Sequence, residues 1–313
     1  MVYSLKHLKL ILANLAGKLP DSIAIVGPTC TGKTDLALAL AEKLNIPIIN
    51  ADSRLIFSEM DIGTAKPSNE ELKKIKHYLV NIKKPNETYS AGDYRKDFDT
   101  SFAEIKENSS QKNGPYAVVV GGTGLYLQSA LENLEMPSVN RDDKLRKELS
   151  ELELPELLVI MNELDPNAQN EVDTKNKIRI IRAIEILKST GKALSEARSK
   201  NTENRYNVIS FGMNFSSREI HNELINKRVL VMLEKGLVKE VEELINKYGV
   251  TRTMLATIGY KEIIAYLQKE CTLEEACAEI QQRTRAYAKR QMTWFKRNQD
   301  IIWLNADEIL IPS

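Results

Sequence analysis

A loop near the start of the chain has the residue types needed to hold a phosphate. Residues 27–34, Gly-Pro-Thr-Cys-Thr-Gly-Lys-Thr, fit the pattern G-x-x-x-x-G-K-[ST] in full. Glycines at 27 and 32 allow the backbone to turn its N–H groups toward an anion, and a helix starting near Lys33 adds the positive end of its dipole. Lys33 supplies a positive charge, and the Thr34 hydroxyl is a suitable ligand for Mg²⁺. This phosphate loop predicts a site for a phosphorylated ligand with Mg²⁺ as cofactor.

A carboxylate is expected beside the phosphate loop. The apolar run Ile46–Ile49 predicts a strand, and Asp52 follows it closely. Ligands of open α/β sheets bind outside the carboxyl ends of the strands, so Asp52 and Lys33 should open onto the same crevice. One interpretation makes Asp52 a general base or a helper of the metal. The other makes it a cap of the segment that follows the strand.

A third strand end has no carboxylate. The apolar run Ala117–Val120 leads into Gly121-Gly122-Thr123-Gly124, where many nucleotide hydrolases carry an acid that holds Mg²⁺. A glycine turn with one hydroxyl stands there instead. This argues against a kinase and favours a diphosphate that is not part of a nucleotide.

These loops require a parallel sheet to position them. Short apolar runs alternate with longer helical patterns, which predicts an α/β fold of the phosphate-loop NTPase type, with helices flanking the sheet. The predicted strands are Ile23–Val26, Ile46–Ile49, Ala117–Val120, Val208–Phe211 and Ile301–Leu304. Residues 137–205 show only helical patterns and predict an all-helical insertion domain. Residues 21–136 and 206–313 form the core, in which Gly236, Gly249 and Gly259 interrupt the C-terminal helices.

The first twenty residues predict an amphipathic helix docked on the core. Its apolar face consists of Leu5, Leu8, Leu12, Leu15 and Leu19. A transit peptide is the alternative, but no arginine occurs before Arg54, which argues against it.

Composition limits the partners of the protein. The 313 residues include 44 Lys and Arg and 43 Asp and Glu, so the net charge of +1 excludes a globally basic surface for nucleic acid. Only three cysteines occur, Cys30, Cys271 and Cys277, without metal-ligand spacing. This pattern favours a reducing compartment, and we expect a cytoplasmic protein that does not interact with membranes.

Positive charge is nevertheless concentrated near the C-terminus. Six basic residues fall within fifteen positions: Arg283, Arg285, Lys289, Arg290, Lys296 and Arg297. Tyr287, Trp294 and Phe295 interleave with them. This basic strip fits either the binding of nucleic-acid phosphates or a solvated helix face whose aromatic side chains pack inward.

Longer motifs give the chain a resemblance to a known family. Beside the phosphate loop and Asn50-Ala-Asp-Ser-Arg54, the sequence contains Met60-Asp-Ile-Gly-Thr-Ala-Lys-Pro67, Tyr89-Ser-Ala-Gly-Asp-Tyr94, Val120-Gly-Gly-Thr-Gly-Leu-Tyr126 and Arg285-Ala-Tyr-Ala-Lys-Arg-Gln-Met-Thr-Trp-Phe295. Together these resemble the bacterial tRNA dimethylallyltransferases, from about Ile23 to Trp303. Cys30 and Thr31 depart from the Ala and Ser that are usual in the family, and the first twenty residues have no counterpart.

The resemblance implies an activity and a set of catalytic residues. The family transfers a dimethylallyl group from its diphosphate to the exocyclic amine of the adenosine immediately 3′ of the tRNA anticodon. Asp52 would accept the proton of the amine, Thr123 would lie near the reacting adenosine, and Arg228 would bind the diphosphate. Without the resemblance, Arg228 would be a solvated charge on a helix. The diphosphate site would consist of Gly27, Pro28, Thr29, Cys30, Thr31, Gly32, Lys33, Thr34 and Arg228, with Thr34 as the metal ligand.

The resemblance also assigns the contacts with tRNA. They comprise Asp52, Ser53, Arg54, Leu55, Thr123, Arg146, Ile178, Arg179, Ile180, Ile181, Arg182, Ala256, Thr257, Ile258, Gly259, Tyr260, Lys261, Arg285, Lys289 and Arg290. Arg179 and Arg182 are three residues apart, so they share a helix face. The adenosine must leave its stack to enter the crevice. We expect a monomer.

Three other functions remain open from sequence. The first is a phosphate-loop kinase for a small metabolite, which needs an ATP site and usually a strand-end acid, and neither can be placed in the sequence. An enzyme that prenylates free adenine nucleotides would keep the phosphate loop and Asp52, but needs neither the insertion nor the basic strip. A non-catalytic RNA-binding protein would leave the phosphate loop without a use.

Overall fold

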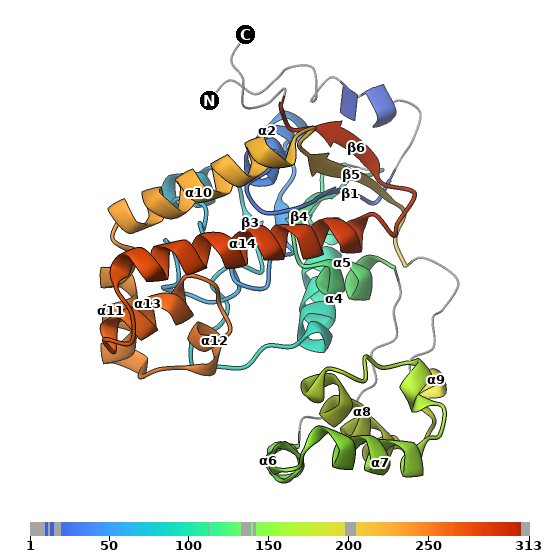
Figure 1. Cartoon of the computed structure of the whole chain (residues 1–313). Coiled ribbons are helices and arrows are strands. Elements are labelled where there is room, and N and C mark those ends of the chain that lie inside the picture. Colours follow the sequence, from blue (N-terminus) through green and yellow to red (C-terminus); the bar gives the residue numbers. More distant parts are fainter. Residues whose placement is uncertain are drawn as a thin grey trace. The chain divides into compact units, whose positions relative to one another are not determined.

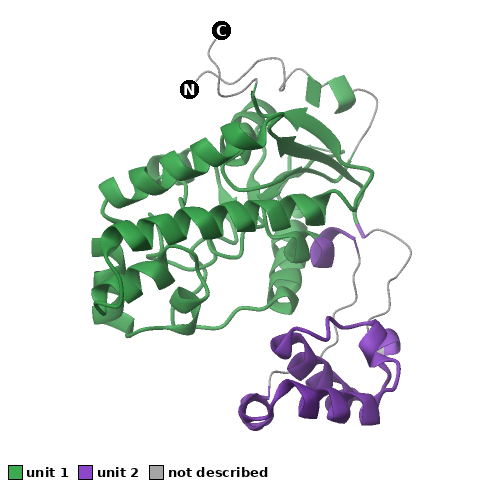
Figure 2. Cartoon of the chain, in the orientation of Figure 1, with its two compact units in different colours: residues 1–127, 206–313 green, residues 128–205 purple. Residues whose placement is uncertain are grey.

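The structure is a computed structural model that describes residues 10–11, 13–15, 20–111, 113–132, 139, 142–197 and 205–307. The chain divides into two compact units (Figure 2). Unit 1 consists of residues 1–127 and 206–313, and unit 2 consists of residues 128–205. The predicted border at 136/137 lies outside the described residues. In the described part of the chain, no helix is long and apolar enough to cross a membrane.

A six-stranded parallel sheet forms the centre of unit 1 (Figure 1). Its strands lie in the order β3-β2-β4-β1-β5-β6. They are β1 (Ser22–Val26), β2 (Ile48–Asn50), β3 (His77–Tyr78), β4 (Ala117–Gly121), β5 (Val208–Asn214) and β6 (Ile302–Asn305). All five predicted strands are present, which confirms the predicted parallel sheet, although β2 begins two residues later than its apolar run. The sequence analysis missed β3, because its two half-buried residues form no apolar run.

Helices connect these strands along the chain. They are α2 (Lys33–Leu44), α3 (Asn69–Lys74), α4 (Ala91–Glu107), α5 (Gly124–Leu131), α10 (Arg218–Glu234), α11 (Leu237–Tyr248), α12 (Arg252–Leu255), α13 (Tyr260–Leu267) and α14 (Leu273–Phe295). Leu36 and Leu40 of α2 join Ile23, Ile25 and Val118 of the sheet in one buried core cluster. Every residue of β1 is buried, as expected for a central strand between two layers.

Glycines end or begin the C-terminal helices at the predicted places. Gly236 and Gly259 precede α11 and α13, with φ angles of 97° and 95°, and Gly249 follows α11 with a φ of 70°. Such positive φ angles favour glycine because it has no Cβ atom. Helices α10 and α14 lie side by side along unit 1 (Figure 1).

The predicted N-terminal helix is described only in part. Leu5, Leu8, Leu12 and Leu19 lie outside the described residues. Residues 10, 11 and 13–15 are helical, and Ile11 is fully buried in the core cluster of unit 1, with Leu15 packed against it.

The described residues of unit 2 form helices around a core of their own. These are α6 (Asp143–Glu151), α7 (Leu154–Leu164), the short 3₁₀ helix η1 (Ala168–Asn170), α8 (Lys177–Thr190) and α9 (Leu194–Ala197). Leu157 and Met161 of α7 pack with Ile180 and Ile184 of α8, and all four are fully buried. An independent core is what a separately folding insertion requires.

A buried carboxylate joins α8 to α6. The Glu185 side chain is fully buried and accepts hydrogen bonds from Arg146 Nε and Nη2, at 2.8 and 2.7 Å, and from the guanidinium of Arg182. The Asp142 N–H donates to the same carboxylate at 2.8 Å. Burial raises the pKa of Glu185, but the hydrogen bonds from the two arginines outweigh it and lower that pKa to about 2.

This ion pair should make unit 2 sensitive to acid. Because the folded pKa of Glu185 lies below its ordinary value of 4.5, its stabilising effect is full above pH 4.5 and is lost as the pH falls toward about 2. Glu185→Ala leaves two arginines without their buried partner, so we expect a loss of about 3–5 kcal/mol in the free energy of unfolding of unit 2.

Urea denaturation at pH 7 and pH 3 measures both effects. The control is Glu148→Ala, which removes an exposed carboxylate from α6. Equal stability of Glu185→Ala and wild type at pH 7 would contradict a stabilising role for the pair.

Candidate functional site

The phosphate loop follows β1 and keeps an unusual backbone conformation. Gly27 and Gly32 have φ angles of 133° and 79°, and Cys30 has a φ of 62°. A Cβ atom at Gly27 would lie 2.5 Å from the carbonyl oxygen of Met213 in β5, so the neighbouring strand also requires a glycine there. Inside the loop, the Thr31 hydroxyl donates to the Pro28 carbonyl at 2.9 Å, and the Lys33 ammonium donates to the same oxygen.

A cavity of about 470 Å³ opens beside this loop. The loop residues Thr29–Thr34 line it together with Asp52, Arg228 and Gln291. Four segments that are separate in the sequence therefore supply the residues for one site. The predicted juxtaposition of Asp52 and Lys33 is present in the structure.

Lys33 is a partly buried cation in this cavity. Burial lowers the pKa of its ammonium group from 10.5 to about 8, and the charge of Arg228 acts in the same direction. Asp52 and Cys30 oppose the shift. A lysine with this pKa is still mostly charged at pH 7, and a bound anion stabilises its charged form.

The structure confirms that Asp52 caps the segment after its strand, and its role as a base or metal helper stays a prediction. Its carboxylate accepts a hydrogen bond from the Arg54 N–H at 2.8 Å, which closes the turn after β2. The same side chain lines the cavity. Asn50 fixes the turn further, because its side chain accepts from the Asp52 N–H at 2.8 Å and donates to the Leu79 carbonyl at 2.8 Å. Asp52 is therefore held in place by backbone contacts while its carboxylate faces the cavity.

Thr123 lies against the same turn. Its hydroxyl accepts a hydrogen bond from the Ser53 N–H at 3.0 Å, and its own N–H donates to the Ala51 carbonyl at 3.1 Å. A Cβ atom at Gly121 would lie 2.2 Å from the Ala51 backbone, so the glycine that ends β4 permits this close approach. The glycine turn and the Asp52 turn thus form one packed unit.

Helix α14 explains the other two glycines of this turn. A Cβ atom at Gly122 would lie 2.1 Å from the Gln291 amide nitrogen, and one at Gly124 would lie 2.2 Å from the Trp294 ring. In the structure the glycines of this turn accommodate α14.

Gln291 joins the two glycine-containing turns. Its side-chain oxygen accepts from the Thr29 N–H at 2.9 Å, and its side-chain nitrogen donates to the Gly122 carbonyl at 2.9 Å. The residue is 5% exposed. Sequence reasoning missed this role, although Gln291 belongs to one of the motifs that carry the family resemblance.

Helix α10 holds the phosphate loop from another direction. The Arg228 guanidinium lies 3.5 Å from the Thr29 hydroxyl and 3.4 Å from the Cys30 sulfur. His221, which the sequence analysis also missed, contacts the Thr29 carbonyl through Nε2 at 2.8 Å, and burial lowers the pKa of its imidazole. Arg228 is therefore part of the cavity wall, and its interpretation as a solvated charge is wrong.

The basic strip divides into paired and exposed residues. Arg283 contacts the carboxylates of Glu279 and Glu262, and Arg285 donates to the Asn226 side chain at 2.5 Å. Lys289, Arg290, Lys296 and Arg297 are exposed, while Ala288, Gln291 and Phe295 of the same helix are buried. This arrangement agrees with a solvated helix face that packs its apolar side inward, and phosphate binding by the exposed residues stays a prediction.

The segment Ala256–Lys261 is largely internal. Tyr260 is fully buried and Thr257 is 4% exposed, whereas Ala256 and Lys261 are exposed. The Arg54 guanidinium donates to the Ala256 carbonyl at 3.0 Å, which ties this segment to the Asp52 turn. Direct contacts with RNA can come only from the exposed members of the segment.

The predicted RNA contacts of unit 2 also differ in exposure. Ile180 and Ile181 belong to its buried core, and Arg146 and Arg182 are paired with Glu185. By contrast, Ile178 is 72% exposed, and the side chain of Arg179 is 63% exposed with Asp173 at 3.7 Å. The exposed atoms near the start of α8 come mainly from these last two residues.

The cavity also has oxygen ligands suited to a hard cation. Thr34 and Asp52 both line it, and Mg²⁺ prefers a few protein oxygens together with phosphate oxygens and water. Among the described residues, no three or more His, Cys, Asp or Glu side chains are grouped so that they could hold a metal ion. The residues present therefore fit a metal that arrives with a phosphorylated substrate.

Comparison with known proteins gives a consistent result over most of the chain. The family model described as IPP transferase matches residues 55–298. The "tRNA dimethylallyltransferase" of Acetivibrio thermocellus is 42% identical over 294 residues, covering 91% of this chain and 92% of that protein. That of Acaryochloris marina is 39% identical over 287 residues, covering 92% and 93%.

Solved structures show the same similarity. The tRNA isopentenylpyrophosphate transferase of Bacillus halodurans is 33% identical with a TM-score of 0.66, over 91% of this chain and 89% of that chain. A eukaryotic dimethylallyltransferase acting on tRNA is 26% identical with a TM-score of 0.78, over 91% and 73%. These comparisons confirm the resemblance and the α/β fold of the phosphate-loop type.

The position of Lys33 predicts how anion binding depends on pH. Above pH 8 the unliganded protein loses the Lys33 charge, so its affinity for a diphosphate should fall as the pH rises. The affinity should decrease by up to about tenfold for each pH unit, because Lys33 must then take up one proton when the diphosphate binds.

Calorimetric titration with an organic diphosphate from pH 7 to 9.5 measures this dependence. Lys33→Ala should bind more weakly at pH 7 and lose the decrease, since ionisation of the ligand is common to both proteins. A wild-type affinity that is constant over this range would show that Lys33 does not bind the anion through its charge.

Proposed function

Because the chain belongs to the IPP transferase family and is an enzyme that transfers a dimethylallyl group to tRNA, we propose that its cavity holds dimethylallyl diphosphate and that Asp52 acts on the RNA. The acceptor is the exocyclic amine of the adenosine immediately 3′ of the anticodon, and diphosphate is released. The observation that carries this proposal is the single cavity shared by the phosphate loop, Arg228 and Asp52.

The diphosphate is the leaving group, and negative charge develops on it as the C–O bond breaks. Lys33, Arg228 and the backbone N–H groups of the phosphate loop can stabilise this charge in a partly buried site. Mg²⁺, held through the Thr34 hydroxyl and the phosphate oxygens, would supply further positive charge. Residues 29–34 line this subsite, and Gly27 and Pro28 would complete its loop.

Asp52 performs the other half of the reaction. The lone pair of the adenine amine is delocalised into the ring, so the amine is a weak nucleophile until it loses a proton. Asp52 would accept that proton while the new C–N bond forms. The Thr123 hydroxyl lies beside the Asp52 turn and would contact the adenosine.

The RNA backbone would be bound by the exposed basic residues. These are Arg179 of unit 2, Lys289 and Arg290 of α14, and Lys261, and the half-buried Arg54 of the Asp52 turn would join them. Arg146 and Arg182 retain partly exposed guanidinium groups, at 23% and 31%, while they pair with Glu185. We place the enzyme in the cytoplasm, since its three cysteines are free and tRNA is its substrate. The monomeric state expected from sequence stays a prediction.

Substrate assays test the proposal as a whole. The protein is incubated with dimethylallyl diphosphate, Mg²⁺ and one acceptor: whole tRNA, an anticodon stem-loop or a free adenine nucleotide. We expect a mass increase of tRNA and the stem-loop at that single adenosine. Transfer to the free nucleotide alone would support the nucleotide-prenylating alternative, and phosphorylation with ATP would support a kinase.

Replacing Asp52 should affect chemistry far more than binding. Asp52→Asn keeps the shape of the side chain but cannot accept the proton, so we expect kcat to fall about 10²–10⁴-fold. The Kd for dimethylallyl diphosphate should change little. Single-turnover rates with saturating tRNA check this, and a near-normal rate would remove Asp52 from the role of base.

RNA affinity should depend on salt through the exposed arginine of unit 2. Arg179→Ala removes one phosphate contact, so the slope of log K against log salt should become shallower by about 0.7–0.9. The control is Lys188→Ala, which removes an exposed charge near the other end of α8. Filter binding of tRNA at several salt concentrations gives the slopes, and equal slopes in Arg179→Ala and wild type would exclude this contact.

A further inference from the structure

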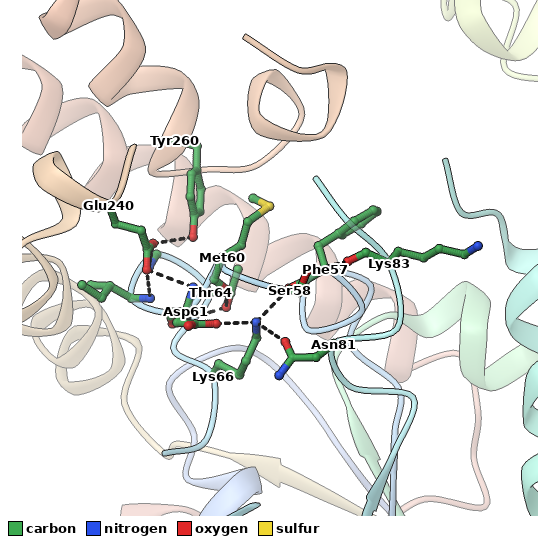
Figure 3. Close-up of polar contacts among 12 residues, drawn as sticks. Phe57, Ser58, Met60, Asp61, Thr64, Lys66, Asn81, Lys83, Glu240 and Tyr260 are labelled. Atoms are coloured by element: carbon green, nitrogen blue, oxygen red, sulfur yellow. Dashed lines mark hydrogen bonds and ion pairs between the residues drawn. The ribbon is translucent and has the colours of Figure 1, made fainter. Parts of the chain in front are cut away.

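The loop Asp61–Lys66 is held by a carboxylate to which the proposed reaction assigns no role. Glu240 of α11 accepts hydrogen bonds from the backbone N–H groups of Asp61, Ile62 and Gly63, at 3.0, 2.7 and 3.1 Å (Figure 3). Consecutive N–H groups that converge on one anion form a backbone nest, and hydrogen bonds to a charged acceptor are stronger than neutral ones. The Glu240 carboxylate therefore fixes the first half of this loop.

A buried ammonium fixes the other half. Lys66 Nζ donates to the Phe57 carbonyl at 2.8 Å, and to the side chains of Asp61 and Asn81 at 2.5 and 2.6 Å (Figure 3). Its side chain is only 3% exposed. The loop thus has a fixed contact at each end, Glu240 at one and Lys66 at the other.

The residues between these contacts form a wall of the diphosphate cavity. Thr64, Ala65, Lys66 and Pro67 line the same cavity as Lys33 and Asp52. Ala65 has a φ of 50°, a left-handed conformation that residues with a Cβ atom adopt infrequently. Since the loop does not favour this shape by itself, the position of the cavity wall depends on the contacts that hold it.

Tyr260 connects Glu240 to a second part of the site. Its hydroxyl donates to Glu240 Oε1 at 2.7 Å. A Cβ atom at Gly63 would lie 2.5 Å from the Tyr260 ring, so the ring packs directly on the loop. Tyr260 begins α13 and belongs to the segment Ala256–Lys261, which Arg54 also contacts.

From these contacts we propose that Glu240 is a positioning residue for the prenyl diphosphate. Its carboxylate, oriented by Tyr260, holds the loop Asp61–Lys66 so that Thr64–Pro67 close one side of the cavity. Glu240 contacts neither reacting atom. The proposal rests on the proposed function, because it assigns the cavity to dimethylallyl diphosphate.

The test is the split between KM and kcat in Glu240→Gln. The amide has the same shape, but it has lost the negative charge and one acceptor oxygen, so the nest is no longer satisfied. We expect KM and Kd for dimethylallyl diphosphate to rise about tenfold, which is the weight of one charge-assisted hydrogen bond. The kcat should stay within about threefold of wild type, because Asp52 is held by other contacts, and threefold is under 1 kcal/mol.

Glu243→Gln is the matched control. It makes the same chemical change on the same helix, at a side chain that is 67% exposed and only 3.7 Å from Lys239. Its KM, Kd and kcat should equal those of wild type.

Tyr260→Phe removes one of the four hydrogen bonds to Glu240 and should raise KM about threefold. Its effect should largely disappear in the Glu240→Gln background, since the two residues act through one contact.

Three outcomes would overturn the inference. The first is a Glu240→Gln protein with wild-type KM and Kd, even if its melting temperature is lower. The second is a loss of kcat without a change in KM, which would point to chemistry. If Glu240→Gln does not fold, a Tyr260→Phe protein with unchanged KM is the third. A wild-type protein that binds dimethylallyl diphosphate but transfers nothing to tRNA contradicts only the proposed function.

Discussion

The side-chain amide of Gln291 joins two turns that lie far apart in the sequence, and the site depends on this connection. The amide bonds the Thr29 N–H of the phosphate loop and the Gly122 carbonyl of the turn after β4. A phosphate loop exposes backbone N–H groups that have no partners inside the loop, so its shape must be stabilised from outside. Here α14 supplies Gln291, and α10 supplies Arg228 and His221. Thr29 is the residue on which all three converge.

The same connection brings the two halves of the reaction together. In the proposed reaction, the phosphate loop would supply positive charge for the leaving diphosphate, and the turn after β4 carries Thr123, which contacts the Asp52 turn through Ser53. One buried amide thus sets the position of the phosphate loop relative to the turn of Asp52, the proposed base. On the other side of the cavity, Glu240 and Lys66 hold the loop Asp61–Lys66 in a comparable way. The proposed chemistry uses few side chains, and the glycine turns and the residues Gln291 and Glu240 around them hold the segments that carry those few.

Sequence alone predicted what local patterns determine. The phosphate loop, Asp52 and the five apolar strands were predicted because a short run of residues indicates each of them. The strand β3 was missed because two half-buried residues carry no pattern. Gln291, His221 and Glu240 were not predicted because their contacts are distant in the sequence. Thr29 lies 262 residues from Gln291 and 192 from His221, and Ile62 lies 178 residues from Glu240, so no local spacing indicates these contacts. The burial of Tyr260, Ile180 and Ile181 was likewise invisible, since the resemblance marks a segment without saying which side chains face outward.

The most direct test of this account is the affinity of Gln291→Leu for dimethylallyl diphosphate, with Gln282→Leu as control. The leucine fills the same space but bonds neither turn, and the control places it at an exposed position of the same helix. We predict that Gln291→Leu stays folded, because α14 retains its apolar packing, while its Kd rises at least about tenfold, the weight of two buried backbone groups left unpaired. A folded Gln291→Leu protein with the Kd of wild type would contradict the claim that α14 shapes the phosphate loop.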